Sequence, residues 1–417
     1  MINILTNISS LVTINANGKL FKAGKDMQDI QEIKNAAMVF DTNIIWVGKE
    51  SELEQYLIDN PIKEYKTISA DNKCIIPGFV DSHTHIVFAG SRSNEFAKRL
   101  RGATYKEIAD EGGGIQTTVK ATRNASIDDL FQNGKTFAIS AIKYGTTALE
   151  IKSGYSLNLD GEIKQLEAIK KLKENLPLSI SSTFMGAHDI PIEFRDNKDK
   201  YIDLICDEML PLIKEKQLAE FCDVFVDEGY FTVNDGDKIF KKASELGFKL
   251  KLHADELANT EAASLAARWD AVSADHLLNV SENGIQNMIK SGTVFTLLPG
   301  TAYFIRLPYA PARKIIDKGG ILAIASDCNP GSCYTENMQL ILSLAVINMN
   351  MTAEEALTAA TLNGAYALRK SDEFGSIEVG KKANFLILDS SNYADLFYHF
   401  GINHVKETWI SGVQFDK

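Results

Sequence analysis

The sequence predicts an α/β fold whose main part is a (β/α)₈ barrel of the TIM type. Two observations lead to this prediction. Between residues 74 and 370, short apolar segments alternate with amphipathic helical patterns, which is typical of parallel strands joined by crossover helices. Eight such strand segments can be counted in this region, and eight βα units are what a closed barrel requires.

The predicted strands leave room for a helix after most of them. In chain order they span residues 74–80, 146–151, 178–184, 222–226, 248–252, 271–274, 293–297 and 321–325. Helical patterns cover residues 128–144, 161–173, 235–246 and 256–268. An open doubly wound sheet is the alternative, but it requires a glycine-rich nucleotide fingerprint after its first strand. The sequence has none there, so the barrel is favoured.

The two ends of the chain, residues 1–73 and 371–417, have a different pattern. Short strands are broken by turns, as where residues 10–14 precede the turn at 15–18. The same pattern returns at residues 375–380 and 383–388.

The composition limits the possible partners. The 417 residues are 45% hydrophobic, so the chain can bury a large core. With 44 basic and 55 acidic residues the net charge is −11, which argues against nucleic acid or an anionic membrane as the main partner. A small anionic substrate remains possible if cations gather at the site.

The cysteines and the first residues bear on localisation. Five cysteines are scattered without a CxxC pair, which favours reduced thiols over disulfides or a thiolate metal site. The start of the chain lacks a basic segment followed by a long apolar one, so we expect no signal peptide. No apolar run reaches membrane-spanning length. We expect a cytoplasmic protein.

The first predicted barrel strand ends in two histidines, His83 and His85. Residues two apart in a strand project from the same face, so the two imidazoles would point the same way and could hold one divalent cation. An isolated pair of this kind is more often a pair of surface histidines. What favours a metal site is the position of the other histidines.

Five of the seven histidines and one aspartate lie at or just past predicted strand ends: His83, His85, His188, His253, His276 and Asp327. In a barrel these ends share one rim, where active sites lie. Any one of them alone is more often a packed polar group. Together they predict a metal site of His83, His85, His253 and Asp327, with water at an open position.

The segment from Ile76 to His85 resembles the signature of the amidohydrolase superfamily. Residues 81–92, 112–119, 150–155, 186–188, 253–256 and 326–332 are similar to the imidazolonepropionase family within it. The resemblance covers essentially the whole chain. It implies that a small β-sandwich domain, built from residues 1–73 and 371–417, flanks a barrel of residues 74–370.

The resemblance also implies a reaction and its cofactor. The reaction is hydrolysis of the cyclic amide C–N bond of 4-imidazolone-5-propanoate to N-formimidoyl-L-glutamate in histidine degradation, by a homodimer. Superfamily members with two metals carry a bridging lysine after strand four, where residues 226–228 have none, and Lys152 follows strand two instead. We therefore expect one metal ion per subunit, either Zn²⁺ or iron, because the same ligands accept both.

Three catalytic roles follow from this chemistry. Asp327 would accept a proton from water and pass it to the departing ring nitrogen. His276 would polarise the carbonyl and stabilise the developing oxyanion. Glu256, expected at the start of the helix 256–268, would bond the ring N–H groups and assist the water. The alternative for Glu256 is charge compensation in a first helical turn.

The substrate carboxylate requires a cation, for which Arg92 is the candidate. Its alternative is a solvated surface charge, which is how we interpret the nearby Lys98, Arg99 and Arg101. The resemblance adds further substrate contacts: Tyr155, His188, Glu256, Asn329, Gly331 and Ser332. The glycine triplet 112–114 is expected to form a flexible segment over the pocket.

Two other functions remain open. One is a deaminase or cyclic-amide hydrolase of the same superfamily that acts on another ring, against which the substrate-binding set argues. The other is a non-catalytic scaffold, which should have lost metal ligands, whereas this sequence has all of them.

Overall fold

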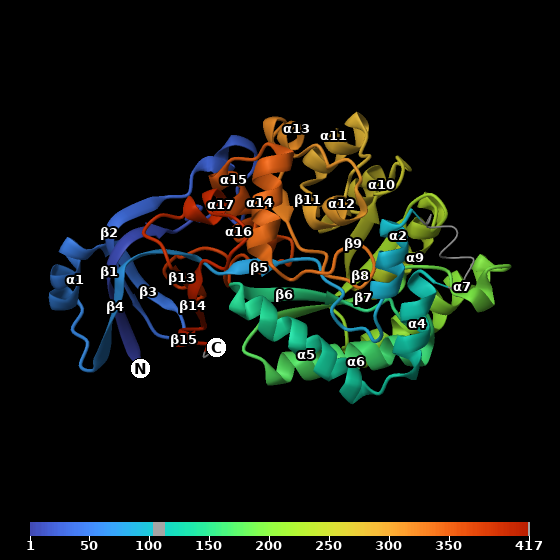
Figure 1. The fold of residues 1–417 in the computed structure, drawn as a ribbon, viewed down its shortest axis with the longest axis horizontal. Helices are drawn as coiled ribbons and strands as arrows, with labels where there is room; N and C mark the ends of the chain where they lie inside the picture. Colours follow the sequence, from blue (N-terminus) through green and yellow to red (C-terminus); the bar gives the residue numbers. More distant parts are fainter. Residues whose placement is uncertain (103–112, 416–417) are drawn as a thin grey trace.

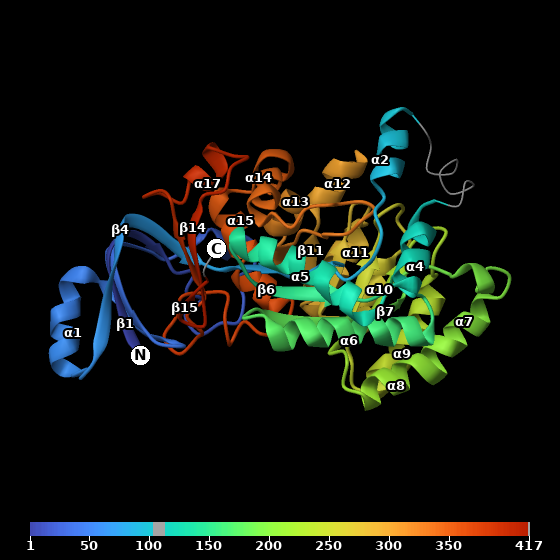
Figure 2. The same ribbon diagram turned by 60° about the horizontal axis from the view of Figure 1, so that its bottom comes forward.

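The computed structural model describes residues 1–102 and 113–415, which form a barrel and a smaller sheet (Figures 1 and 2). Gly112 of the glycine triplet lies outside the described residues. In both views the smaller sheet lies at one end of the molecule and contains strands from both ends of the chain. The predicted α/β fold, a (β/α)₈ barrel with a small β domain from both chain ends, is confirmed, and the strands of the small domain belong to one sheet.

The barrel is an eight-stranded parallel sheet in which strands neighbour each other in chain order, from β5 to β12. The strands are β5 (Phe79–Asp81), β6 (Thr146–Lys152), β7 (Ser179–Ala187), β8 (Phe221–Val226), β9 (Lys249–Ala254), β10 (Ser273–His276), β11 (Val294–Leu297) and β12 (Leu322–Ile324). Seven of the eight predicted segments coincide with these strands to within two or three residues at each end.

The residues after the first and last strands close the barrel. The backbone N–H of Asp327 donates to the carbonyl of His83 (3.0 Å), and that of His85 donates to the carbonyl of Cys328 (2.9 Å). The carboxylate of Asp81 accepts the backbone N–H of Ser326 (2.9 Å). Three of the four predicted metal ligands therefore lie on segments that are hydrogen-bonded to each other.

Helices surround the barrel and follow the predicted pattern. They are α2 (Ser93–Leu100), α4 (Ile115–Asn124), α5 (Ile127–Lys143), α6 (Leu159–Asn175), α7 (Lys198–Leu204), α8 (Leu210–Glu215), α9 (Val233–Glu245), α10 (Ala262–Arg268), α11 (Glu282–Ser291), α12 (Pro299–Ile305), α13 (Ala312–Asp317), α14 (Met338–Met349), α15 (Ala353–Ala359) and α16 (Leu362–Tyr366). Local sequence determines several starts, because Ser126, Asn158 and Thr232 accept backbone N–H groups of the first turns of α5, α6 and α9.

The smaller sheet has seven strands in the order β15-β14-β13-β4-β1-β2-β3. They are β1 (Ile2–Val12), β2 (Glu32–Phe40), β3 (Ile44–Lys49), β4 (Tyr65–Pro77), β13 (Phe385–Leu388), β14 (Val405–Ile410) and β15 (Val413–Gln414), with the short helices α1 (Leu53–Asp59) and α17 (Asp395–Tyr398) beside them in sequence. Its core contains a cluster of the aromatic rings of Phe40, Phe385 and Trp409, whose centroids lie 5.2–5.5 Å apart.

Two predicted elements differ from the structure. The predicted strand 74–80 is divided, because β4 continues to Pro77 in the smaller sheet and the barrel strand begins only at Phe79. Gly78 makes the transition, where a Cβ would collide with Thr147. An apolar run looks the same whichever sheet it enters, so its pattern could not show the division.

The predicted helix 256–268 begins six residues late, at Ala262. The carboxylate of Asp255 accepts the backbone N–H groups of Thr260, Ala262 and Ala263 and so holds the turn before the helix. Glu256 therefore lies in the loop after β9, and charge compensation in a first helical turn is not its role.

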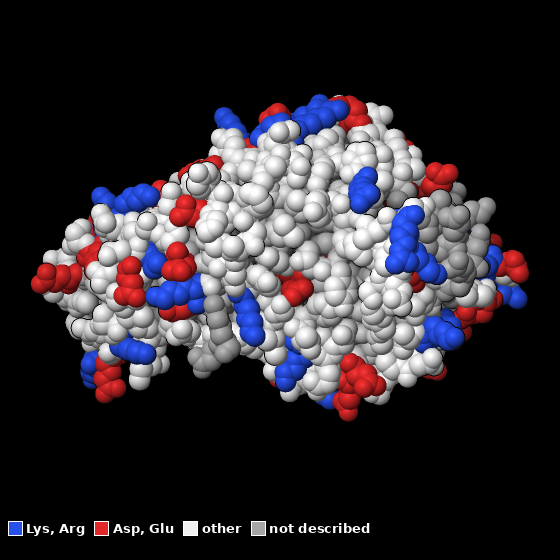
Figure 3. Space-filling view, in the orientation of Figure 1, with Lys and Arg blue, Asp and Glu red and all other residues white. Residues whose placement is uncertain are grey.

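Charged side chains of both signs are interspersed on the face shown in Figure 3, mostly around its edges, while the middle of this face carries few. Among the described residues, the helices are each too short or too polar to cross a bilayer.

Candidate metal centre and substrate pocket

Four side chains converge at the carboxyl ends of the barrel strands. The Nε2 atom of His85 lies 3.3 Å from that of His83 and 3.4 Å from that of His253. The Oδ1 atom of Asp327 lies 3.4 Å from Nε2 of His83 and 3.7 Å from Nε2 of His85. Ligands about 2.1 Å from a tetrahedral metal ion are about 3.4 Å apart, so this spacing fits one ion.

The protonation of the rings explains why a cation fits. Nδ1 of His83 lies 2.6 Å from a carboxylate oxygen of Asp275, and Nδ1 of His253 lies 3.0 Å from one of Asp223. A neutral imidazole that donates from Nδ1 has a lone pair on Nε2. Two such lone pairs and the carboxylate of Asp327 therefore face one another, an arrangement that a metal ion would stabilise.

Burial also favours the neutral form of these imidazole rings. His83 and His85 are 0% and 2% exposed. Burial lowers the pKa of each well below its ordinary value, with further lowering by neighbouring cationic groups, so both imidazoles are neutral at physiological pH. Metal ions bind the neutral form of histidine.

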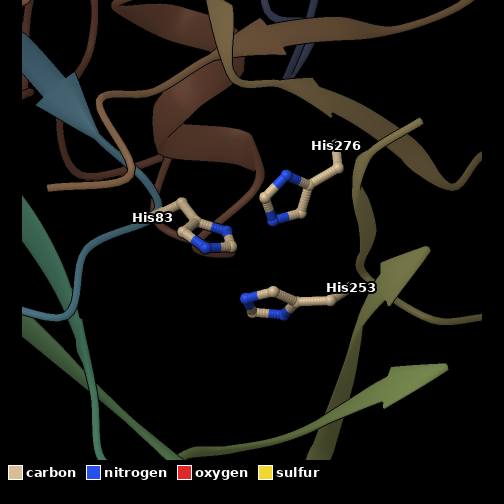
Figure 4. A group of neighbouring side chains, drawn as sticks. All are labelled: His83, His253 and His276. Carbon is tan, nitrogen blue, oxygen red and sulfur yellow. The ribbon is translucent and has the colours of Figure 1, made fainter. Parts of the chain in front are cut away.

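His276 borders the same space. Figure 4 shows the rings of His83, His253 and His276 facing a common centre from different segments of the barrel, and their nitrogens also meet the spacing of a metal site. Nδ1 of His276 lies 3.6 Å from Oε2 of Glu256, which is too long for a hydrogen bond. His276 also has a positive backbone φ of 73°, a strained conformation that is common at functional sites.

Asp327 has two differently placed oxygens. Oδ1 faces the histidines, while Oδ2 accepts a hydrogen bond from Thr301 Oγ1 at 2.5 Å. Burial raises the pKa of Asp327 to about 6, against the opposing effect of the Thr301 hydrogen bond. A carboxylate with this pKa can accept and release a proton near neutral pH. Thr301, on α12, was not identified from the sequence.

A cavity of about 520 Å³ opens above these residues. The structure places the remaining predicted site residues along its walls: Arg92, Tyr155, His188, Glu256, His276, Asn329, Gly331 and Ser332. Rings also line it that sequence reasoning missed: Phe96, Phe225, Tyr230, Phe304 and Tyr334. An apolar wall with a few convergent polar groups is typical of a small-molecule site.

Two arginines lie in the cavity wall. Nε of Arg92 donates to Glu95 Oε2 at 2.8 Å, and its guanidinium packs so closely on Gly331 that a Cβ there would collide with it. The prediction that Arg99 is a surface residue is wrong. Its guanidinium lies 5.2 Å and 5.6 Å from the ring centroids of Phe304 and Phe96, and it lines the same cavity.

His188 follows β7 and stacks on His85, with ring centroids 5.0 Å apart. Its Nδ1 lies 3.0 Å from the carbonyl oxygen of Gly154, and burial lowers its pKa to about 3. The ring is therefore neutral, Nδ1 is the donor and Nε2 is left as an acceptor. Gly154 has φ 108° and no space for a Cβ beside His188, so glycine is required there.

Asn329 uses its amide within the loop after β12. Its Oδ1 accepts the backbone N–H groups of Gly331 and Ser332, both at 2.8 Å, and its Nδ2 donates to the carbonyl of Asp327 at 2.8 Å. Tyr155 is 3% exposed, with its ring 5.7 Å from that of His85. Asn329 thus shapes the loop, and Tyr155 packs beside the metal-facing ring.

Sequence reasoning also missed a buried charge cluster below the four converging side chains. It consists of Glu150, Lys152, Asp223, Lys251 and Asp275, each at most 1% exposed. The alternation of β6 and β9 could have indicated it, because Lys152 and Lys251 occupy inward positions of buried strands. Donor atoms of His83, Glu150 and Asp275 also meet the spacing of a metal site, but the ammonium groups of Lys152 and Lys251 already bind Glu150 and lie 3.8 Å from Asp275.

The barrel fold and the histidine and aspartate donors at its rim together indicate a class of barrel proteins that hold a metal ion at this rim. The model of the amidohydrolase family matches residues 74–414. Among solved structures, an adenosine deaminase from Xanthomonas campestris with bound zinc covers 99% of this chain and 92% of its own, at TM-score 0.68 and 19% identity. A guanine deaminase from C. acetobutylicum has TM-score 0.70 and 16% identity, with both chains fully covered. These likenesses show the fold, and the family match shows that the chain belongs to the amidohydrolase family.

Its relatives narrow the assignment. Imidazolonepropionase from Alkaliphilus oremlandii is 46% identical over 98% of this chain and 96% of its own length. The one from Caldanaerobacter subterraneus is 45% identical over 96% of this chain and 95% of its own. Within the amidohydrolases, the chain is a member of the imidazolonepropionase family.

Proposed function

We propose that this chain hydrolyses the cyclic amide C–N bond of 4-imidazolone-5-propanoate and releases N-formimidoyl-L-glutamate, the reaction of histidine degradation. The observation that carries the proposal is the convergence of three imidazole Nε2 atoms and Asp327 below a cavity that also holds Arg92. The first group can hold a metal ion, and the guanidinium can bind the propionate.

The ion in this proposal is one Zn²⁺ or iron ion held by His83, His85, His253 and Asp327. Such an ion supplies Lewis acidity, which makes water nucleophilic near neutral pH. The zinc of the Xanthomonas adenosine deaminase supports a metal in this fold. A single ion is supported by the end of β8, which has no lysine, and by Lys152, whose ammonium binds Glu150 and Asp223 at 2.8 Å each.

Asp327 is the proton carrier in the proposed mechanism. Its pKa of about 6 leaves it mostly ionised at neutral pH, so it can take a proton from the attacking water and return it to the leaving ring nitrogen. The hydrogen bond from Thr301 holds its side chain in one orientation during this transfer.

His276 and Glu256 act on the ring itself. Burial lowers the pKa of His276 well below its ordinary value, so it is a neutral donor that can polarise the ring carbonyl. Burial, together with Asp327 and Asp227, raises the pKa of Glu256 well above its ordinary value. A protonated Glu256 offers both an O–H donor and a carbonyl acceptor to the ring.

The cavity wall determines how the substrate is oriented. Nε2 of His188 is an acceptor, so it suits a ring N–H of the substrate and not its carboxylate. Arg92 suits the carboxylate, because a guanidinium binds it through two parallel hydrogen bonds. Gly331 allows the guanidinium to approach the loop after β12.

The ultraviolet absorbance of the imidazolone ring tests this function. The metal-loaded protein should remove this absorbance and produce N-formimidoyl-L-glutamate in equal amount. Turnover of a nucleobase or hydantoin with an intact imidazolone would favour the alternative hydrolase, and protein that binds no metal would favour the scaffold. Elemental analysis that finds two metal equivalents in active protein would contradict the single ion.

Three further expectations stay predictions: the domain boundaries at residues 73/74 and 370/371, the homodimer and the cytoplasmic location. Limited proteolysis, light scattering and cell fractionation test them in turn.

A further inference from the structure

The buried charge cluster of Glu150, Lys152, Asp223, Lys251 and Asp275 has no role in the proposed reaction. It lies below the four converging side chains, and two of its carboxylates hold metal-facing imidazoles. It contains three carboxylates and two ammonium groups, all out of contact with solvent. Burying unpaired charge is costly, so each member depends on its neighbours.

We infer that Lys152 is a positioning residue for the metal centre: its ammonium holds Asp223 and Asp275, which orient His253 and His83, and it thereby sets metal affinity without contacting the metal. The inference rests on the proposed metal site. In superfamily members with two metals a lysine after strand four bridges the ions, whereas Lys152 follows strand two and acts through the carboxylates of Asp223 and Asp275.

The path through Asp223 is continuous. Nζ of Lys152 lies 2.8 Å from Oδ2 of Asp223, and Oδ1 of the same carboxylate lies 3.0 Å from Nδ1 of His253 and 3.1 Å from its backbone nitrogen. One carboxylate therefore joins the ammonium to both the ring and the backbone of His253. The lysine determines which way the carboxylate faces.

The connection from Lys152 to His83 through Asp275 includes a longer contact. Oδ2 of Asp275 lies 2.6 Å from Nδ1 of His83 and 3.8 Å from Nζ of both Lys152 and Lys251. Its other oxygen accepts the hydroxyl of Ser273 at 2.6 Å. Asp275 is thus held between its hydrogen-bond partners and two positive charges.

Lys251 cannot replace Lys152. Its ammonium donates to Glu150 Oε2 at 2.7 Å and to the carbonyl of Ser82 at 2.9 Å, and in the described part of the chain its ion pairs are with Glu150 and Asp275, not with Asp223. Without Lys152, Asp223 would lose its charged partner and become free to turn from His253. The ring of His253 would then lose the hydrogen bond that fixes its orientation and its tautomer.

The test measures zinc affinity of the full chain by competition with a chromophoric chelator. Lys152→Met keeps the length of the side chain and removes its charge. We expect zinc affinity to fall about 10- to 100-fold, the effect typical of partners that orient metal ligands, with an unchanged circular dichroism spectrum. Lys22→Met is the matched control, because Lys22 is also buried, at 5% exposed, but its ammonium donates to the backbone carbonyl of Asp29 and lies 3.9 Å from the carboxylate of Asp29, outside the cluster. It should keep wild-type affinity.

A double-mutant cycle separates positioning from loss of packing. Asp223→Asn and Lys152→Met should together weaken zinc binding by less than the product of their separate effects, because both act through one carboxylate. The double variant removes one charge of each sign, so the net charge of the buried cluster stays the same. Should Lys152→Met unfold, Asp223→Asn is compared directly with the wild type, and an unchanged zinc affinity of Asp223→Asn would overturn the inference.

Wild-type zinc affinity in folded Lys152→Met, or independent effects in the cycle, would overturn the inference. Turnover does not enter this test. Failure of the imidazolone assay would therefore reject the proposed function and leave the role of Lys152 unaffected.

Discussion

The rim of the barrel and the core of the smaller sheet are both buried, but their chemistry is opposite. At the rim, His83 and Asp327 are 0% and 2% exposed and face other polar groups. In the smaller sheet, Phe40 and Phe385 are 0% exposed and pack ring against ring. Burial of polar groups costs solvation free energy, whereas burial of apolar rings stabilises the fold. The rim therefore serves chemistry, and the smaller sheet serves stability.

Among changes at the barrel rim, replacing Asp327 with Ala should have the largest effect on catalysis. The change removes a metal ligand and the proton carrier, so we expect kcat to fall by at least about 10³-fold. The melting temperature of the metal-free protein should stay within a few degrees. The control is Asp317→Ala, which removes an exposed aspartate paired with Arg313 and should leave kcat unchanged. Near-normal turnover by Asp327→Ala would remove the residue from the mechanism.

Replacing Phe40 with Ala tests how much the core of the smaller sheet contributes to stability. The cavity left among Phe385 and Trp409 should lower the free energy of unfolding by about 3–5 kcal/mol, measured with denaturant. Where the variant remains folded, kcat and KM should be those of the wild type. Phe400→Ala is the control, because Phe400 is 61% exposed and should change little. A lowered kcat in folded Phe40→Ala would couple the two regions.

Replacing Arg92 with Ala should mainly weaken substrate binding. Loss of a charged hydrogen-bond partner for the propionate should raise KM about 10- to 100-fold, with a smaller change in kcat. Arg268→Ala is the control, since Arg268 forms an exposed ion pair with Asp237. If KM were unchanged while kcat fell, Arg92 would have a role other than binding the propionate.

The pH dependence of metal binding distinguishes the ligands. Burial lowers the pKa values of His83 and His85 well below the ordinary value for histidine, so these rings remain neutral ligands to a lower pH than a free imidazole. Asp327 has a pKa of about 6, so it takes up a proton as the pH falls through this value. Because one proton competes with the ion, zinc affinity should fall about tenfold per pH unit below this value. In Asp327→Asn this slope between pH 5 and 6 should be shallower than in the wild type; an unchanged slope would point to another group.

The smallest expected effect is at Gly331. In Gly331→Ala the new Cβ would displace the guanidinium of Arg92, so KM should rise severalfold while the stability and kcat stay close to wild type. Combining this change with Arg92→Ala should add nothing further to KM. An additive effect would show that Gly331 acts on the loop itself.

Much of the fold followed from local pattern. Seven barrel strands lie where apolar runs predicted them, because a buried parallel strand is apolar on both faces wherever it occurs. The sequence pattern failed where one continuous run of residues contributes to two different structural elements. Residues 74–80 enter both sheets, and the loop that holds Glu256 continues a helical pattern before the helix itself begins.

Most site residues also followed from their places at strand ends, but not Arg99, Thr301 or the buried charge cluster. Arg99 stands beside Lys98 and Arg101 in a charged stretch, and only the approach of Phe304 on α12 turns it into a residue of the cavity wall. A charge in sequence gives no sign of which element will cover it.

By itself, the sequence determined that eight strands would bring their last residues to one rim, and which histidines and aspartates stand there. The tertiary structure alone decided which atom of each side chain faces the metal position. His83 is oriented by Asp275, which is 192 residues away in the chain, and His253 by Asp223, which is held by Lys152 on another strand. Local sequence sets periodicity, whereas hydrogen-bond partners in a barrel come from neighbouring strands and exist only after the sheet has closed.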